Sequence, residues 1–235
     1  MLKVSRQQDG TPEIFYSIQG EGINTGKPAV FLRMALCNLA CRWCDTRYTW
    51  DWGEGDAIQY AVEMSSNQVE QEILKHGCRF LVITGGEPML QQRELLPLLK
   101  NLKNKGLFFE IETNGTILPE PDMIDLIDHW NVSSKLTNSG NKISSREKSE
   151  CYHFFCVLPS SHFKFVVDTE KDIKEIKFLV QKYGLKPEKV ILMPQATNRE
   201  VLLEKSRWLV ELCKKEGYIY SLRLHILLWG DKRGI

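Results

Sequence analysis

The chain has 235 residues, of which 43% are hydrophobic and 26% are charged, and its formal net charge is +1 at pH 7. This size and composition predict a globular protein with a single domain over residues 1–235. The near-neutral charge argues against a nucleic-acid partner, and no stretch reaches the roughly 18 apolar residues that a membrane span needs.

The segments of the chain alternate between strand-like and helix-like patterns. Expected strands, in chain order, are residues 29–36, 79–83, 107–112, 130–132, 163–167, 190–193 and 221–226. Expected helices are residues 66–76, 91–105, 121–128, 170–183 and 198–216. Thr197 and Glu200 suit a capping box for the last helix. The polar residues 136–161 predict a long loop with at most one helical turn.

This alternation predicts parallel strands joined by right-handed crossovers. The polar motifs of the chain follow the expected strand ends, and a (β/α) barrel gathers the carboxyl ends of its strands around one mouth. There are too few helices for a complete ring. We therefore expect an α/β fold, a partial and open TIM-like (β/α) barrel of about six to seven mostly parallel strands.

The seven cysteines are an odd number with uneven spacing, and the first residues lack the apolar core of a secretion signal. This pattern favours reduced thiols in the cytoplasm over a disulfide framework.

Three of these cysteines, Cys37, Cys41 and Cys44, form a C-x3-C-x2-C loop directly after the first expected strand. Thiolates this close in sequence usually hold a metal or a cluster. They can each bind one iron of a 4Fe-4S cluster and leave the fourth iron without a protein ligand. The alternative is zinc with His76 or His153 as fourth ligand, although the second Cys or His pair typical of zinc sites is missing.

Two other strand ends carry polar motifs. Residues 84–88, Thr-Gly-Gly-Glu-Pro, expose backbone at Gly85 and Gly86, and the carboxylate of Glu87 suits an ammonium group. A tight turn with Glu87 near a helix N-terminus is the structural alternative. Residues 112–115, Glu-Thr-Asn-Gly, form either a second site segment or a simple Asx turn.

Several single residues allow both a structural and a functional interpretation. Gln19 and Glu21 lie in a glycine-rich loop that is either solvated or close to a ligand. Arg33, inside a strand, needs a partner, which is Glu13, Glu21 or the carboxylate of a substrate. His225 is either a core histidine or a site residue.

With these motifs the chain resembles the radical S-adenosylmethionine enzymes, which carry the three-cysteine loop with an aromatic residue before the last cysteine and the Gly-Gly-Glu-Pro turn. Within that superfamily it resembles the 7-carboxy-7-deazaguanine synthase family over nearly its whole length. The shared motifs are residues 17–22, Arg33, 44–46, 84–88, 112–115, 135–136, 139–140, 163–166, 224–225, 229–230 and 233–234.

The resemblance implies a lyase that converts 6-carboxy-5,6,7,8-tetrahydropterin to 7-carboxy-7-deazaguanine with loss of ammonia, on the route to 7-deazapurines such as queuosine and archaeosine. The implied cofactors are a 4Fe-4S cluster, S-adenosylmethionine and Mg2+. Cleavage of S-adenosylmethionine would give a radical that takes a hydrogen atom from the substrate and later returns it. The implied partners are flavodoxin or ferredoxin as electron donor and a second copy of the chain in a homodimer.

The resemblance also implies roles for individual residues. The cluster ligands would be Cys37, Cys41 and Cys44, and Thr46 would bind Mg2+. Contacts to S-adenosylmethionine would come from Trp43, Cys44, Asp45, Gly86, Glu87, Ser133, Ser134, Lys135, Gln195, Ala196, Thr197 and Asn198. Contacts to the substrate would come from Ile18, Gln19, Gly20, Glu21, Arg33, Thr84 and His225. No side chain is expected to act as an acid or base, because the radical comes from the cofactor.

Two alternative functions remain at this point. One is a radical S-adenosylmethionine activase of a glycyl-radical enzyme, which needs a groove for a peptide in place of a small polar site. The other, from a different class, is a binding module stabilised by zinc.

Overall fold

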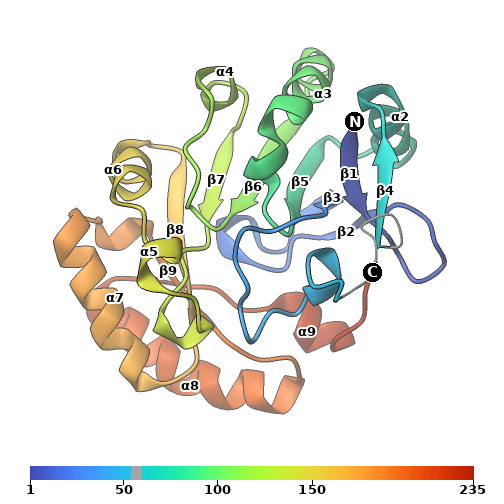
Figure 1. Cartoon of the computed structure of the whole chain (residues 1–235). Helices are drawn as coiled ribbons and strands as arrows, with labels where there is room; N and C mark the ends of the chain where they lie inside the picture. Colours follow the sequence, from blue (N-terminus) through green and yellow to red (C-terminus); the bar gives the residue numbers. More distant parts are fainter. Residues whose placement is uncertain (54–59) are drawn as a thin grey trace.

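The computed structural model describes residues 1–53 and 60–235 (Figure 1). Within these residues, ten strands form one sheet, in the order β10-β9-β8-β7-β6-β5-β3-β1-β4, with β2 also paired to β3. The strands are β1 Leu2–Ser5, β2 Ile14–Ile18, β3 Pro28–Met34, β4 Ala61–Met64, β5 Phe80–Gly85, β6 Phe108–Thr113, β7 His129–Val132, β8 Ser161–Val167, β9 Val190–Pro194 and β10 Ile219–Tyr220. The helices are α2 Ser66–Lys75, α3 Gln92–Asn104, α4 Pro121–Ile124, α5 Ile143–Arg146, α6 Ser149–Val157, α7 Glu170–Tyr183, α8 Arg199–Glu216 and α9 Leu224–Trp229.

The strands from β3 through β5 to β10 are parallel neighbours, and the sheet curves into an open barrel. Figure 1 shows α2, α3, α4, α6, α7 and α8 along the outside of this sheet. The α/β partial barrel expected from the sequence is thereby confirmed. None of the helices in the described ranges has the length and apolarity needed to cross a lipid bilayer.

Alternation along the parallel strands gives the sheet two different faces. Apolar side chains such as Ile83, Phe109 and Trp130 are buried in the main core beneath the helices. On the inner face, polar side chains such as Glu110 and Asn131 are also buried. Since buried polar groups need partners, the inside of the barrel is built as a hydrogen-bonded network.

Three antiparallel strands, β1, β2 and β4, add to the set expected from the sequence. Two of them have only four residues, which is too short an alternation to recognise from composition. They extend the sheet beyond β3, and β2 leads directly into the loop that carries Gln19 and Glu21.

The expected strand over residues 221–226 is wrong. The last strand, β10, contains only Ile219 and Tyr220, and α9 begins at Leu224. The apolar residues in this segment also suit a short helix. In α9, Ile226 packs in a small cluster with Ala196 and Leu202. His225 therefore lies on a helix.

The long loop expected over residues 136–161 is also wrong, since it contains α5 and the nine-residue helix α6. α6 buries Cys151, Tyr152 and Phe155. Tyr152 stacks on Tyr183 of α7, with ring centroids 4.2 Å apart. The surrounding serine and asparagine residues conceal this apolar face in the sequence.

The capping box expected at Thr197 and Glu200 is also wrong. Asn198 is the N-cap of α8, and its side-chain oxygen accepts the N–H of Val201 at 2.9 Å. The helix therefore begins at Arg199, and Asn198 satisfies one of its free N–H groups.

Candidate functional site

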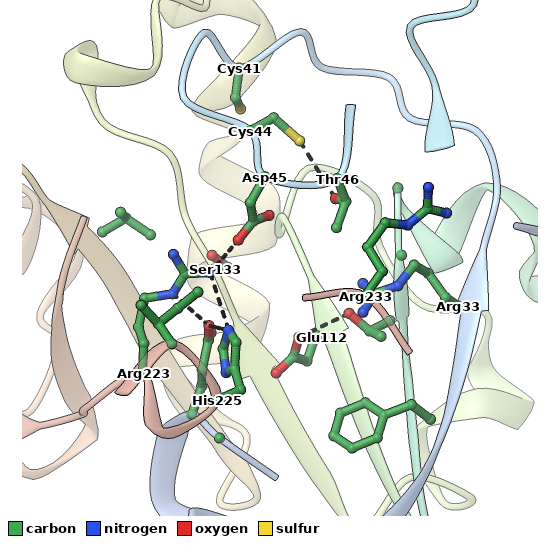
Figure 2. Close-up of a pocket in the computed structure, with 18 of the residues that line it drawn as sticks. Arg33, Cys41, Cys44, Asp45, Thr46, Glu112, Ser133, Arg223, His225 and Arg233 are labelled. Carbon is green, nitrogen blue, oxygen red and sulfur yellow. Dashed lines mark hydrogen bonds and ion pairs between the residues drawn. The ribbon is translucent and has the colours of Figure 1, made fainter. Parts of the chain in front are cut away.

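A cavity of about 240 Å³ lies at the carboxyl ends of the parallel strands (Figure 2). Most of the site residues expected from the sequence line it. They are Ile18, Gln19, Gly20, Glu21, Arg33, Cys37, Cys41, Trp43, Cys44, Asp45, Thr46, Thr84, Gly86, Ser133, Lys135, Gln195 and His225. They come from segments far apart in the chain, and the sheet brings them together as the barrel geometry predicts.

The three thiols of Cys37, Cys41 and Cys44 line this cavity together. Burial raises the pKa of the Cys37 thiol to about 11 and also raises that of Cys41. Across the residues that the structure describes, no three His, Cys, Asp or Glu side chains are close enough to hold one metal ion. Three soft sulfur donors fit an iron–sulfur cluster, in which each thiolate binds a different iron. His76 and His153, the ligands of the zinc alternative, are absent from the cavity lining.

The Gly85–Gly86 turn holds the start of the cysteine loop. The N–H of Gly86 donates to the carbonyl oxygen of Met34 at 2.9 Å, and the N–H of Glu87 donates to that of Leu36 at 2.7 Å. A Cβ atom on Gly85 would lie 2.1 Å from the Met34 oxygen, and one on Gly86 would lie 1.9 Å from the Leu36 oxygen. Only glycine therefore allows the turn and the loop to pack this closely.

Glu87 itself is fully buried and is absent from the cavity lining. Its carboxylate accepts the N–H groups of Met89 at 3.0 Å and Asn114 at 2.6 Å and the hydroxyl of Thr113 at 2.8 Å. Burial raises its pKa, against the effect of these donors. The carboxylate thus joins the ends of β5 and β6, and its contact with S-adenosylmethionine stays a prediction.

Four other expected residues also lie outside the cavity lining: Ser134, Ala196, Thr197 and Asn198. Ser134 and Ala196 are buried, and Asn198 caps α8. Their roles stay predictions.

Arg223, which the sequence analysis did not single out, connects the two ends of the site. Its Nε donates to Glu21 at 3.1 Å, and its Nη2 donates to Asp45. Lys164 of β8 also donates to Glu21. Burial acts to raise the pKa of Glu21, but the charges of Lys164 and Arg223 outweigh it and hold that pKa well below its usual range. Burial also acts to raise the pKa of Asp45, but the pairing with Arg223 outweighs this effect and lowers that pKa. Both carboxylates thus remain ionised.

His225 packs against the Gly20 loop. A Cβ atom on Gly20 would lie 2.4 Å from the ring nitrogen Nδ1 of His225, so this position requires glycine. The Nε2 atom of His225 lies 3.9 Å from Glu21 and 3.4 Å from Nη2 of Arg223. Burial is the main cause that lowers the pKa of His225. The neutral ring can then donate or accept a hydrogen bond in the cavity.

Glu112 is a second residue that the sequence analysis did not assign. It lies at the end of β6 and lines the cavity. Its carboxylate accepts the Thr84 hydroxyl at 2.9 Å and the Gln19 amide at 3.3 Å. The motif over residues 112–115 indicated that Glu112 could belong to a site. Its contacts with Thr84 and Gln19 could not be predicted, because they depend on which strands are neighbours in the sheet.

Arg33 pairs with Glu13, one of the three partners that the sequence allowed. Its Nε donates to Glu13 at 2.9 Å, and the hydroxyl of Tyr48 donates to the same oxygen at 3.0 Å. Arg33 also lines the cavity and lies beside Thr84 in the register of β3 and β5. The ion pair therefore positions the guanidinium at the cavity wall.

Comparison with known proteins identifies the relatives of the chain. Residues 32–134 match the radical SAM superfamily. The 7-carboxy-7-deazaguanine synthase of Pyrobaculum aerophilum is 37% identical over 94% of this chain and 95% of its own. That of Hyperthermus butylicus is 34% identical over 92% of this chain and 91% of its own.

The chain belongs to the 7-carboxy-7-deazaguanine synthase family. A crystal structure of QueE from Escherichia coli superposes with a TM-score of 0.67 at 26% identity, over 95% of this chain and 94% of that one. Streptococcus suis SuiB, solved with S-adenosylmethionine, shares the fold, with a TM-score of 0.53 at 13% identity over 81% of this chain and 51% of that one.

Membership of the 7-carboxy-7-deazaguanine synthase family decides between the alternatives left open by the sequence. The radical SAM match contains the three cysteines and the Gly-Gly-Glu-Pro turn, and so favours the 4Fe-4S cluster over zinc. The names of the relatives favour the lyase over the activase.

Proposed function

We propose that this protein catalyses the reaction of its family, the conversion of 6-carboxy-5,6,7,8-tetrahydropterin to 7-carboxy-7-deazaguanine with loss of ammonia. Family membership over nearly the whole chain supports the reaction. The observation that carries the proposal at the level of the site is a single cavity with three thiols and a set of polar side chains suited to a small polar ring.

The cavity has two chemically different ends. Figure 2 shows Cys41 and Cys44 at one end, Glu112 and His225 at the other, and Asp45 and Thr46 between them. When bound, the cluster and S-adenosylmethionine supply a radical that removes a hydrogen atom from the substrate. This arrangement supports a binding site for S-adenosylmethionine beside the thiols and a substrate site beyond it.

The residues of the substrate end suit a pterin carboxylate. The guanidinium of Arg33 can bind the substrate carboxylate, for which its planar donors are well shaped. Gln19 and Glu112 can bind the amide and amino edge of the ring, which carries both donors and acceptors. Thr84 fixes the Glu112 carboxylate for this contact.

The residues of the thiol end suit S-adenosylmethionine. Arg223 pairs with one carboxylate oxygen of Asp45 and holds this side chain at the cavity wall, where it can contact S-adenosylmethionine. Nζ of Lys135 lies 5.8 Å from the ring centroid of Trp43, so the two side chains hold each other in place at this end of the cavity. Gln195 lines the same cavity from the end of β9.

Thr46 is the proposed ligand of Mg2+. Its hydroxyl lies 3.6 Å from the sulfur of Cys44 and between the two ends of the cavity. Mg2+ keeps several waters and takes few protein oxygens, so one hydroxyl together with the substrate carboxylate is a suitable ligand set.

The partners of the protein follow from this chemistry. It needs a small-molecule substrate and an electron donor, for which we propose flavodoxin or ferredoxin. We also propose that the chain forms a homodimer and acts in the cytoplasm, in the synthesis of 7-deazapurines such as the queuosine precursor.

Anaerobic turnover tests the function. The reconstituted and reduced protein is incubated with 6-carboxy-5,6,7,8-tetrahydropterin, S-adenosylmethionine and Mg2+, and the products are separated by chromatography. We expect 7-carboxy-7-deazaguanine and ammonia in equal amounts. If 5′-deoxyadenosine accumulates without 7-carboxy-7-deazaguanine, the cofactor site stands but the substrate assignment is wrong.

A further inference from the structure

The turn formed by residues 138–141 packs directly on the cysteine loop. The backbone N–H of Arg42 donates to the carbonyl oxygen of Ser139 at 2.9 Å, and its Nε donates to that of Asn138 at 2.6 Å. The indole N–H of Trp43 donates to the side chain of Asn138 at 3.1 Å. This first part of the segment over residues 136–161 therefore belongs to the surroundings of the thiols.

Each of the three thiol sulfurs accepts one N–H group. The backbone N–H of Leu39 lies 3.5 Å from the sulfur of Cys37. The side-chain amide of Asn141 donates to Cys41 at 3.2 Å, and the indole N–H of Trp50 donates to Cys44 at 3.3 Å. Two of the three donors are thus side chains, which can be changed without touching a cysteine.

The orientation of the Asn141 amide follows from its other contacts. Its carbonyl oxygen accepts the backbone N–H of Ala40 at 2.9 Å, a group that can only donate. Its nitrogen must then face the sulfur of Cys41, and it also contacts the hydroxyl of Ser139 at 3.1 Å. Asn141 therefore acts both as a tie to the loop and as a donor to a thiol.

We propose that Asn141 and Trp50 raise the reduction potential of the cluster by donating hydrogen bonds to two of its thiolate ligands. Reduction adds an electron to the cluster, and part of the added charge lies on the sulfurs. An N–H donor stabilises that charge, so its removal makes reduction harder. This inference rests on the proposed function in one respect, the presence of the 4Fe-4S cluster, and does not depend on the identity of the substrate.

Two substitutions remove one donor each. Trp50→Phe keeps an aromatic ring but has no N–H group. Asn141→Asp keeps an oxygen for the Ala40 N–H and replaces the amide nitrogen with a charged oxygen, so its shift counts as loss of the donor only where Trp50→Phe, which adds no charge, shifts the midpoint in the same direction. Trp52→Phe is the matched control, because the indole N–H of Trp52 donates to the carbonyl oxygen of Tyr48 at 2.9 Å and not to a sulfur.

The test is a potentiometric titration of the reconstituted protein, without S-adenosylmethionine or substrate, followed by electron paramagnetic resonance. We expect Trp50→Phe and Asn141→Asp to shift the midpoint to more negative values, each by at least threefold in the equilibrium constant, or about 30 mV for one electron. Trp52→Phe should match the wild type. The midpoint is taken from the loaded fraction, so partial loss of cluster does not affect it.

An unchanged midpoint in Trp50→Phe would overturn the proposal, whatever the shift in Asn141→Asp. Asn141→Ala removes the donor and also cuts the tie to Ala40. If the midpoint shifts in Asn141→Ala but in neither Trp50→Phe nor Asn141→Asp, the position of the loop is the cause, and the proposal is also overturned. Neither result bears on the substrate, since the titration contains none. If the wild type forms no 7-carboxy-7-deazaguanine in the anaerobic turnover experiment, that result counts against the proposed function and not against the roles of Asn141 and Trp50.

Discussion

Arg223 binds carboxylates from two separate loops, Glu21 after β2 and Asp45 in the cysteine loop. Its third nitrogen, Nη1, donates to the carbonyl oxygen of Ala196. The side chain is almost entirely buried, with 6% of the residue exposed. This one guanidinium therefore connects both ends of the cavity with the loop after β9.

Replacing Arg223 by methionine should lower the free energy of unfolding by about 3 kcal/mol, because a buried charged pair that loses one partner leaves an unpaired charge. Urea denaturation measures this difference. Arg93→Met is the control, since Arg93 forms an exposed pair with Glu120 that is worth less than about 1 kcal/mol. Equal denaturation midpoints for the two variants would show that the Arg223 pairs do not stabilise the fold.

The residues found from the sequence and those missed differ in a physical way. Cys37 and Arg33 are marked by local features, a spacing of thiols and a charge inside an apolar strand. Lys164 and Arg223 also lie inside expected strands, but their partner Glu21 comes from a distant segment and is known only once the sheet is assembled. Arg223 was further concealed by the strand expected over residues 221–226.

At the scale of elements, the end signals decide how well a helix is predicted. The bounds of α7, Glu170–Tyr183, agree with the sequence because a capping box at Thr169 and a left-handed Gly184 mark both ends. α9 has no side-chain cap, and the hydrogen bond from the Leu224 N–H to the Gly20 carbonyl oxygen ties its start to a distant loop. Tertiary contacts of this kind cannot be seen in a local pattern.

The inner faces of β6, β7 and β8 carry a chain of hydrogen bonds below the substrate end. Nδ1 of His129 lies 2.8 Å from Glu110, and its Nε2 lies 3.1 Å from Nδ1 of His162. Glu110 also accepts the side-chain amides of Gln19 and Asn24. The strands thus support the position of Gln19 from below.

The burial of His162 within this chain of hydrogen bonds makes stability depend on pH. Burial, followed by the charge of His129, lowers the pKa of His162 to about 4 from an ordinary value of 6.5. Between these values the unfolded chain binds a proton that the folded chain does not, so the free energy of unfolding falls as the pH drops from 6.5 toward 4.

His162→Gln should therefore lose less thermal stability than the wild type between about pH 7.5 and about pH 5.5. Melting temperatures at the two pH values provide the comparison. His76→Gln, which changes an exposed histidine at the end of α2, should keep the wild-type pH dependence. If His162→Gln also keeps it, His162 does not contribute to the acid sensitivity.

At the scale of the whole molecule, one sheet places the cysteine loop, the Gly20 loop and α9 around the same cavity. The continuous sheet also supports the single domain expected over residues 1–235, which stays a prediction. Direct transfer of a hydrogen atom requires S-adenosylmethionine and the pterin to lie side by side between the thiols and Glu112.

Turnover of substrate that carries deuterium at C6 tests this requirement most directly. The label is followed by mass spectrometry in the product, in 5′-deoxyadenosine and in the remaining S-adenosylmethionine. We predict that deuterium enters the S-adenosylmethionine pool while 7-carboxy-7-deazaguanine forms. Product formation with no deuterium in S-adenosylmethionine or 5′-deoxyadenosine would contradict the account.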